Sequence, residues 1–350
     1  LTKRMLADGS FEELPQRTPN DFMENGLGWP EYEVEGDAPA VRARARYKLW
    51  GQEAVKKIML IDVAEGRASL DEFMAQLTDR ELAELLGGQP NTGVANTFGF
   101  GNLPEYGVPN LMTADGPAGL RIAPQCGVCT TAWPCSTMLA CTWNRSLVEE
   151  VGAAAAREVK ENNISFWLTP AVNIHRSPLC GRNFEYYSED PYLTGEMASA
   201  MVTGIQSQKI GATVKHFACN NKETNRKNSD SRVSERAIRE IYLKAFEIIV
   251  KKADPWAIMS SYNLINGHRA SENKDLLTGI LRDEWGFQGL VTTDWWTKGE
   301  HYKETLAGND IKMGTGYPER LMEALEKGLL TRKDLEICVE RVLKVFMRAE

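Results

Sequence analysis

Short apolar runs alternate with longer amphipathic stretches from about residue 105 to the end of the chain. The apolar runs predict strands, because they are rich in β-branched and aromatic residues, and they span 108–115, 164–174, 211–218, 257–263, 289–295 and 309–314. The amphipathic stretches have helical spacing and span 146–162, 190–208, 234–252, 274–285, 318–328 and 331–348. Strand–helix alternation over this length is typical of a parallel sheet in an α/β fold.

The 350 residues are close to the length of one (β/α)8 barrel with an appendage. We therefore predict a TIM-like (β/α)8 barrel over residues 76–350, with one or two strands irregular or unrecognised. Residues 1–75 are predicted to be a linker or wrapping arm from a preceding domain, because much of this segment is rich in Pro, Gly and acidic residues. Within it, residues 41–64 fit one helix. Just after residues 1–75, Thr78 fits the start of another helix, with Glu81 completing a capping box.

Composition narrows the class of protein. Hydrophobic residues make up 43% and charged residues 25%, and the net charge is -7 from 41 basic and 48 acidic residues. This modest acidity argues against a nucleic-acid partner, and no apolar run approaches the ~20 residues that span a bilayer. The seven cysteines are expected to be reduced thiols of a cytoplasmic enzyme. The alternative is a zinc site, but its four cysteines lack paired C-x2-C knuckles; they are Cys126, Cys129, Cys135 and Cys141.

Polar residues gather where the predicted strands end. They are Asp115, His175-Arg176, Lys215-His216, Tyr262-Asn263 and Asp294-Trp295. In a (β/α)8 barrel the carboxyl ends of the strands carry the active site. The sequence therefore predicts one site built from these strand ends.

Asp294 follows the apolar strand and is itself followed by Trp295 and Trp296. Aromatic rings stack on the apolar faces of a pyranose, and a carboxylate beside them attacks or stabilises an oxocarbenium-like centre. The alternative is a helix N-cap aspartate with two core tryptophans. Lys215 and His216 are candidates to bind sugar hydroxyls and to keep a nearby aspartate ionised, or else to form ordinary barrel salt bridges. Both reach one pocket only if their strand ends or bulges there.

The loop between the second predicted strand and its helix concentrates charge, and its carboxylates and arginines are expected to pair. Arg182 is a candidate clamp on a carboxylate or on vicinal hydroxyls. Asp190 and Pro191 fit the N-cap and first position of the next helix. Asp115 lies in a Gly/Pro turn, where it is either a hydroxyl-binding carboxylate or a turn former.

At these stretches the sequence resembles glycoside hydrolase family 3. The motifs occur in the family's order and are DGPAGLR, GRNFEYYSEDPYLTG, KHFACNNKETNR, VSERAIREIYLKAFE, MSSYN and TTDWW. The resemblance covers roughly residues 75–350. It implies that Asp294 forms a glycosyl-enzyme intermediate and that Tyr262 and Trp295 lie beside it. It further implies that the sugar hydroxyls are held by Asp115, Arg182, Lys215 and His216, and that Met259 and Glu185 fall at the site.

The same resemblance leaves the general acid/base outside the chain. Family members that cleave N-acetylglucosamine carry a histidine in a loop whose counterpart here reads Asp230-Ser231-Arg232. In the β-glucosidase branch the acid/base is a Glu on a separate α/β-sandwich domain. The chain is therefore expected to be the C-terminal half of a permuted enzyme or one of two chains, with the sandwich as its partner.

The function expected is a retaining, exo-acting β-glucosidase that removes terminal non-reducing β-D-glucosyl residues. Two carboxylates about 5–5.5 Å apart carry out such a reaction, so neither a cofactor nor a metal is expected. The alternatives are a β-xylosidase, a β-N-acetylglucosaminidase, a non-catalytic sugar-binding barrel, and a phosphate-binding barrel that would use Gly314-Thr315-Gly316. Homo-oligomerisation stays open.

Overall fold

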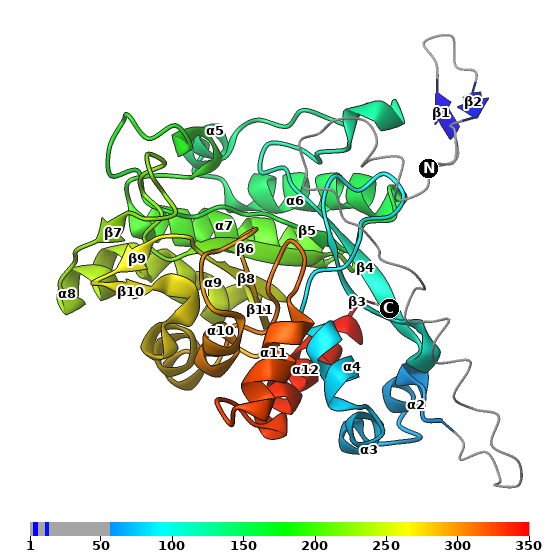
Figure 1. Cartoon of the computed structure of the whole chain (residues 1–350). Helices are drawn as coiled ribbons and strands as arrows, with labels where there is room; N and C mark the ends of the chain where they lie inside the picture. The colour runs from blue at the N-terminus through cyan, green and yellow to red at the C-terminus, as the bar shows by residue number, and fades with distance from the viewer. Residues whose placement is uncertain (1–2, 6–10, 14–56, 350) are drawn as a thin grey trace, which may run out of the picture.

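The computed structural model describes residues 3–5, 11–13 and 57–349. Its main sheet has six strands (Figure 1). In order across the sheet they are β11 (Leu290–Thr293), β8 (Ala257–Ser260), β6 (Gly211–Phe217), β5 (Phe166–Trp167), β4 (Val108–Ala114) and β3 (Gly99–Leu103). The first five are parallel to their neighbours and β3 is antiparallel to β4.

Single bridges join the two edges of this sheet. Thr292 of β11 pairs in parallel with Ile311, and Lys312 pairs with Gly87. Gln89 then pairs antiparallel with Gly99 of β3. The segments at 87–89 and 311–312 thus complete a ring of eight, so the predicted TIM-like barrel is confirmed, and its irregularity lies in the reversed strand β3 and in these two minimal segments.

Helices lie around the outside of the strands (Figure 1). They are α2 (Leu60–Ala64), α3 (Leu70–Ala75), α4 (Asp79–Leu85), α5 (Ser136–Cys141), α6 (Arg145–Glu161), α7 (Pro191–Gln206), α8 (Glu235–Ala237), a π-helical segment (Ile238–Tyr242), α9 (Lys244–Ala253), a second π-helical segment (Asp275–Glu284), α10 (His301–Ala307), α11 (Pro318–Glu326) and α12 (Arg332–Phe346). No helix of the described residues is long and apolar enough to cross a membrane.

Two predicted helix starts are confirmed. Thr78 accepts a hydrogen bond from the Glu81 N–H while the Glu81 carboxylate accepts from the Thr78 N–H, which is the predicted capping box of α4. Asp190 caps α7 by accepting from the Tyr192 N–H at 2.8 Å, with Pro191 in the first turn. These caps satisfy backbone donors that have no partner within the helix.

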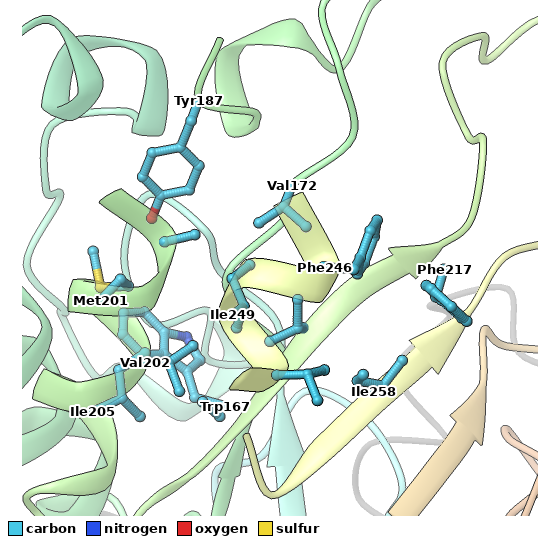
Figure 2. Close-up of a cluster of buried hydrophobic side chains, with 14 of the residues drawn as sticks. Trp167, Val172, Tyr187, Met201, Val202, Ile205, Phe217, Phe246, Ile249 and Ile258 are labelled. Carbon is cyan, nitrogen blue, oxygen red and sulfur yellow. The ribbon is translucent and has the colours of Figure 1, made fainter. Parts of the chain in front are cut away.

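Buried apolar side chains between the sheet and helices α6, α7 and α9 form a core that holds the strands in position. Figure 2 shows Trp167, Phe217, Phe246 and Ile258 among the side chains that meet between sheet and helices. Helices α6 and α7 approach so closely that a Cβ added at Gly204 would lie 2.1 Å from the Glu149 carbonyl oxygen. Glycine is required there for this crossing.

Three smaller features complete the fold. β7 (Asp230–Ser231), β9 (Leu264–Ile265) and β10 (His268–Arg269) form a separate small sheet, and β1 (Lys3–Met5) pairs with β2 (Phe11–Glu13). Residues 57–75 pack on the barrel, because Leu60 and Phe73 are buried in one cluster with Phe346 of α12. The helix predicted over 41–64 lies outside the described residues except for α2 and its flanks, and the domain boundary at residue 75 stays a prediction.

Candidate active site

A pocket of about 680 Å³ opens at the carboxyl ends of the parallel strands. The nine residues that the family resemblance places at the site all line it, and they are Asp115, Arg182, Glu185, Lys215, His216, Met259, Tyr262, Asp294 and Trp295. Seven come from the ends of β4, β6, β8 and β11, which parallel pairing brings to one rim. Arg182 and Glu185 come from the long loop before α7.

The other polar residues of the predicted strand ends do not line the pocket, and they are His175, Arg176 and Asn263. His175 Nε2 lies 2.8 Å from the Asn183 carbonyl, and Asn263 donates to the Ala218 carbonyl.

Asp294 lies one residue beyond β11 and is held by two backbone contacts. Its N–H donates to the Ser260 carbonyl at 3.0 Å, and its Oδ1 accepts from the Trp295 N–H at 2.8 Å. Its Oδ2 lies 3.8 Å from Nε2 of His216. The N-cap alternative is wrong, because the next helix begins at His301 and Glu300 precedes it. The carboxylate is therefore oriented through one oxygen, and the other faces the pocket.

Burial raises the pKa of Asp294 above its usual 3.8. The charge of Arg182, the Trp295 N–H and the charge of Lys215 act in the opposite direction and limit the rise. Desolvation disfavours a carboxylate, and nearby cations favour it. The ionised form of Asp294 thus depends on the basic residues of the pocket.

Lys215 and His216 both reach the pocket, because the pairing of β6 with β8 shifts register between Lys215 and Phe217. Of the two conditions under which both residues could reach one pocket, an irregularity in the strand is therefore the one that is met. Lys215 Nζ lies 3.6 Å from Oδ1 of Asp115. The side chain of Lys215 is only 4% exposed, so this ammonium group is shielded from bulk water and its interactions are weakly screened.

His216 is neutral in this environment. Its burial, together with the charges of Arg182 and Lys215, holds its pKa well below the usual 6.5. Nε2 lies 3.0 Å from Nη2 of Arg182. Because arginine only donates, Nε2 accepts, and the ring proton lies on Nδ1, which faces Oδ1 of Asn173 at 3.4 Å. The expectation that a positive His216 keeps the aspartate ionised is wrong; Arg182 and Lys215 do this instead.

Arg182 binds carboxylates, which is one of the two roles predicted for it. Its Nε donates to Glu185, and its Nη1 lies 3.8 Å from Oε1 of Glu223. Glu223 also accepts from Arg226 at 2.9 Å. Among the described residues that line the pocket, Asp115 and Glu185 therefore each face a cation, and Asp294 is the carboxylate without a lysine or arginine ion pair.

The pocket contains residues that the strand-end argument missed. Arg226 lines it, with its guanidinium 4.8 Å from the centre of the Tyr262 ring. The half-exposed Phe184 also lines it. Trp296, which the sequence places next to Trp295 as a second candidate ring, lines it as well. The Tyr262 hydroxyl donates to the Trp295 carbonyl at 2.6 Å. Arg226 lies within the KETNR stretch, but it belongs to an irregular loop whose path no periodicity predicts.

The alternative sites gain no geometric support. Asp230 and Ser231 form β7 of the small sheet, where Arg232 pairs with Asp230 at 2.6 Å and is 78% exposed. Gly316 packs on the barrel backbone, since a Cβ at Gly87 would lie 2.5 Å from the Gly316 Cα. Close packing thus explains the glycines of the suggested phosphate loop. All seven cysteines are free, and no cluster of His, Cys, Asp or Glu in the described part of the chain is arranged to hold a metal.

Comparisons with known proteins agree with this geometry. The family described as "Glycosyl hydrolase family 3 N terminal domain" matches residues 102–345. Beta-glucosidase A of Butyrivibrio fibrisolvens is 63% identical over 345 residues, which cover 96% of this chain and 41% of that protein. The similarity therefore extends into the first 70 residues, which the sequence resemblance left out.

Two solved structures share the fold. Beta-glucosidase 3B from Thermotoga neapolitana in complex with alpha-D-glucose matches with a TM-score of 0.77 and 46% identity, covering 80% of this chain and 43% of that chain. A beta-glucosidase from Paenibacillus barengoltzii matches with a TM-score of 0.79 and 39% identity, covering 99% of this chain and 39% of that chain. The chain thus spans less than half the length of these relatives.

Proposed function

The chain belongs to glycosyl hydrolase family 3, and we propose that it is the barrel part of a retaining β-glucosidase. The observation that carries the proposal is the state of Asp294, whose Oδ1 is held by a backbone N–H at 2.8 Å while no lysine or arginine of the described residues pairs with it. A nucleophile needs this combination of a fixed orientation and an oxygen that is not bound by a lysine or arginine. The substrate proposed is a terminal, non-reducing β-D-glucosyl residue, in line with the names of the relatives.

In the first step one oxygen of Asp294 attacks the anomeric carbon, and the bond from that carbon to the leaving oxygen breaks. The product is a glycosyl ester of Asp294, which water then hydrolyses with net retention. Lys215, Arg182, His216 and Asp115 hold the sugar hydroxyls in the proposal. Lys215 and Arg182 also keep Asp294 ionised, which is the state that attacks.

The proposal assigns the general acid/base to a part of the protein other than residues 76–350. Glu185 and Glu223 are the carboxyl groups within reach, but both are bound to Arg182, and Glu223 also to Arg226. Because both carboxylates are engaged in ion pairs with guanidinium groups, the proposal gives neither of them the role of general acid. An α/β-sandwich domain or chain with a protonated Glu supplies it. Seven free thiols support a reducing, cytoplasmic setting.

Mechanism-based labelling tests the assignment. A 2,4-dinitrophenyl 2-deoxy-2-fluoro-β-glucoside needs little protonation to lose its leaving group, and its fluorine slows hydrolysis of the ester. The expected result is a stable adduct on the peptide that contains Asp294, found by mass mapping. Asp294→Asn is the control and should remain unlabelled while folding normally. Labelling of Glu185 would contradict the proposal. The matching 2-fluoro xyloside, and a 5-fluoro N-acetylglucosaminide that keeps the acetamido group at C2, distinguish the alternative sugars.

A further inference from the structure

The chain leaves β11 through a turn that carries part of the pocket. This turn, residues 294–300, lies between the end of β11 at Thr293 and the start of α10 at His301, and we call it the Asp294 turn. Its first three residues, Asp294, Trp295 and Trp296, line the pocket. Trp296 has a φ of 52°, in the left-handed region that a bulky residue rarely adopts. Such a conformation persists only where surrounding contacts determine it, so the turn depends on the groups that hold it.

Lys312, on the neighbouring segment of the barrel, provides several of these contacts. Its Nζ donates to the Gly299 carbonyl at 3.0 Å, and it lies 2.9 Å from Oγ1 and 3.4 Å from the carbonyl oxygen of Thr297. The carbonyl of the next residue, Met313, accepts from the Trp296 N–H at 2.8 Å. Lys312 is only 1% exposed, so its hydrogen bonds form away from bulk water and are stronger for it. The segment at 312–313 therefore binds the Asp294 turn at three of its residues.

Glu304 of α10 completes the arrangement. Its Oε2 accepts from Lys312 at 2.6 Å, and its Oε1 accepts from the hydroxyls of Thr297 at 2.8 Å and Ser271 at 2.7 Å. Because the Thr297 hydroxyl donates to Glu304, it accepts from Lys312, and it is the point at which both charged groups bind the turn. A Cβ added at Gly299 would lie 2.1 Å from Oε1 of Glu304. Glycine is thus required for the turn to approach this carboxylate so closely.

The stability of the fold alone does not account for this buried pair. Desolvation of two charges largely cancels their attraction, and apolar residues of similar size often replace such a pair without loss of stability. Apolar residues could not, however, donate to the carbonyl of Gly299 or bind the hydroxyl of Thr297. The hydrogen bonds of Lys312 and Glu304 to other residues end on the Asp294 turn and on Ser271, which belongs to the loop that follows β8. The pair therefore fixes this turn relative to a neighbouring strand end.

We propose that Lys312 and Glu304 are positioning residues of the reaction, which act through Thr297 to hold Asp294 and the two tryptophans in their places in the pocket. The inference rests on the proposed function and deepens it. Thr297 lies three residues beyond Asp294 and directly follows Trp296, so release of its side chain frees the strained part of the turn. Nucleophilic attack requires alignment with the anomeric carbon, and a displacement of about 1 Å caused by a distant substitution can reduce the rate about 100-fold.

Substitutions of Thr297 separate positioning from packing. Thr297→Val keeps the shape of the side chain and removes the hydroxyl, whereas Thr297→Ser keeps the hydroxyl and removes a methyl group. A positioning role predicts that valine is the damaging change, and a packing role predicts that serine is. The matched control is Thr305→Val, because Thr305 is also a buried threonine but its hydroxyl donates to the His301 carbonyl within α10.

The rate at which the 350-residue chain is labelled by the 2-fluoro dinitrophenyl glucoside measures the step that Asp294 carries out. Thr297→Val should lower the first-order labelling constant about tenfold or more while the affinity for the reagent changes less than about threefold. Thr297→Ser and Thr305→Val should stay within about twofold of the unaltered chain. A labelling constant within twofold in Thr297→Val, or a larger loss in Thr297→Ser than in Thr297→Val, would overturn the proposal.

A double substitution tests the charged pair itself. Lys312→Met with Glu304→Leu removes both charges, so that neither is left buried without its partner. It should lower the labelling constant at least as much as Thr297→Val does, while thermal unfolding shows that the barrel is folded. An unchanged labelling constant in the double variant would show that Lys312 and Glu304 do not position the turn.

Fluorine NMR of the chain labelled with 5-fluorotryptophan reports on the turn without any reaction. The Trp296 resonance, assigned with Trp296→Phe, should be a single sharp line in the unaltered chain, Thr297→Ser and Thr305→Val. It should split or broaden in Thr297→Val, and a single sharp line there would overturn the proposal whatever the activity. If the unaltered chain were not labelled at Asp294 although the resonance responds as expected, the proposed β-glucosidase function would be refuted while the hold on the turn would stand.

Discussion

Lys215→Met is the sharpest test of how the pocket supports Asp294. The ammonium group is 3.6 Å from Asp115 and its side chain is 4% exposed. Methionine is an unbranched side chain one atom shorter than lysine, and it lacks the charge and the donors. A hydrogen bond to a charged group contributes about 1.5–3 kcal/mol, and such bonds to sugar hydroxyls strengthen as charge develops. We expect a loss of about 2–4 kcal/mol in transition-state stabilisation, which corresponds to roughly 30- to 900-fold in kcat/KM.

The same substitution changes the pH dependence in a defined direction. Lys215 lowers the pKa of Asp294 against the effect of burial, so its removal raises this pKa further. In the proposed mechanism only ionised Asp294 attacks, so the acid limb of kcat/KM is expected to move to higher pH. The assay is a pH series with 2,4-dinitrophenyl β-glucoside and azide, which isolates the nucleophile. Lys333→Met, at a 67% exposed position on α12, is the control. A change below tenfold with an unmoved acid limb would refute this role of Lys215.

Two further predictions concern the acid/base, which the proposal places outside this chain, and the stability of the fold. Residues 1–350 alone should hydrolyse cellobiose poorly but release dinitrophenol from the aryl glucoside, and azide should accelerate turnover and give β-glucosyl azide. Full cellobiose activity that azide leaves unchanged would return the acid/base to this chain, with Glu223 and Glu185 as candidates. Asp310→Asn should lower the free energy of unfolding by about 3–5 kcal/mol in urea, because it leaves the nearly buried Arg282 without its carboxylate and also removes the partner of the partly exposed Arg341. Asp254→Asn, at an exposed ion pair, should cost less than about 1 kcal/mol.

Strands that follow a simple pattern could be predicted from sequence, and strands that depend on the closed ring could not. Residues 211–217 and 290–293 were predicted because each segment begins with a run of apolar and β-branched residues. The strand predicted over 164–174 is cut to Phe166–Trp167, because Pro170 has no N–H for a ladder. β3 was missed because Gly99 and Gly101 weaken any strand pattern. These glycines are required by the packing of neighbouring side chains, which sequence reasoning does not see.

The site was predictable where its residues occupy strand ends, since parallel pairing alone brings those ends together. Asp115, Lys215 and Asp294 are of this kind. Arg226 was not predictable, because its position depends on contacts with Glu223 and the Tyr262 ring that join an irregular loop to another strand end. The neutral state of His216 was also missed, because it results from burial next to Arg182.

The distribution of charge around Asp294 bears on both halves of the proposed reaction. Asp115 faces Lys215, and Glu185 and Glu223 face arginines, so these pairs fix positions while Asp294 keeps a negative charge without a direct ion pair. A carboxyl group brought over the mouth of the pocket would meet that charge, which raises its pKa and keeps it protonated as an acid. Once Asp294 is a glycosyl ester its charge is gone, the pKa of the incoming carboxyl falls, and the same group becomes the base that activates water. The neutrality of His216 favours this change, because a cation so close to Asp294 would weaken the negative field on which it depends.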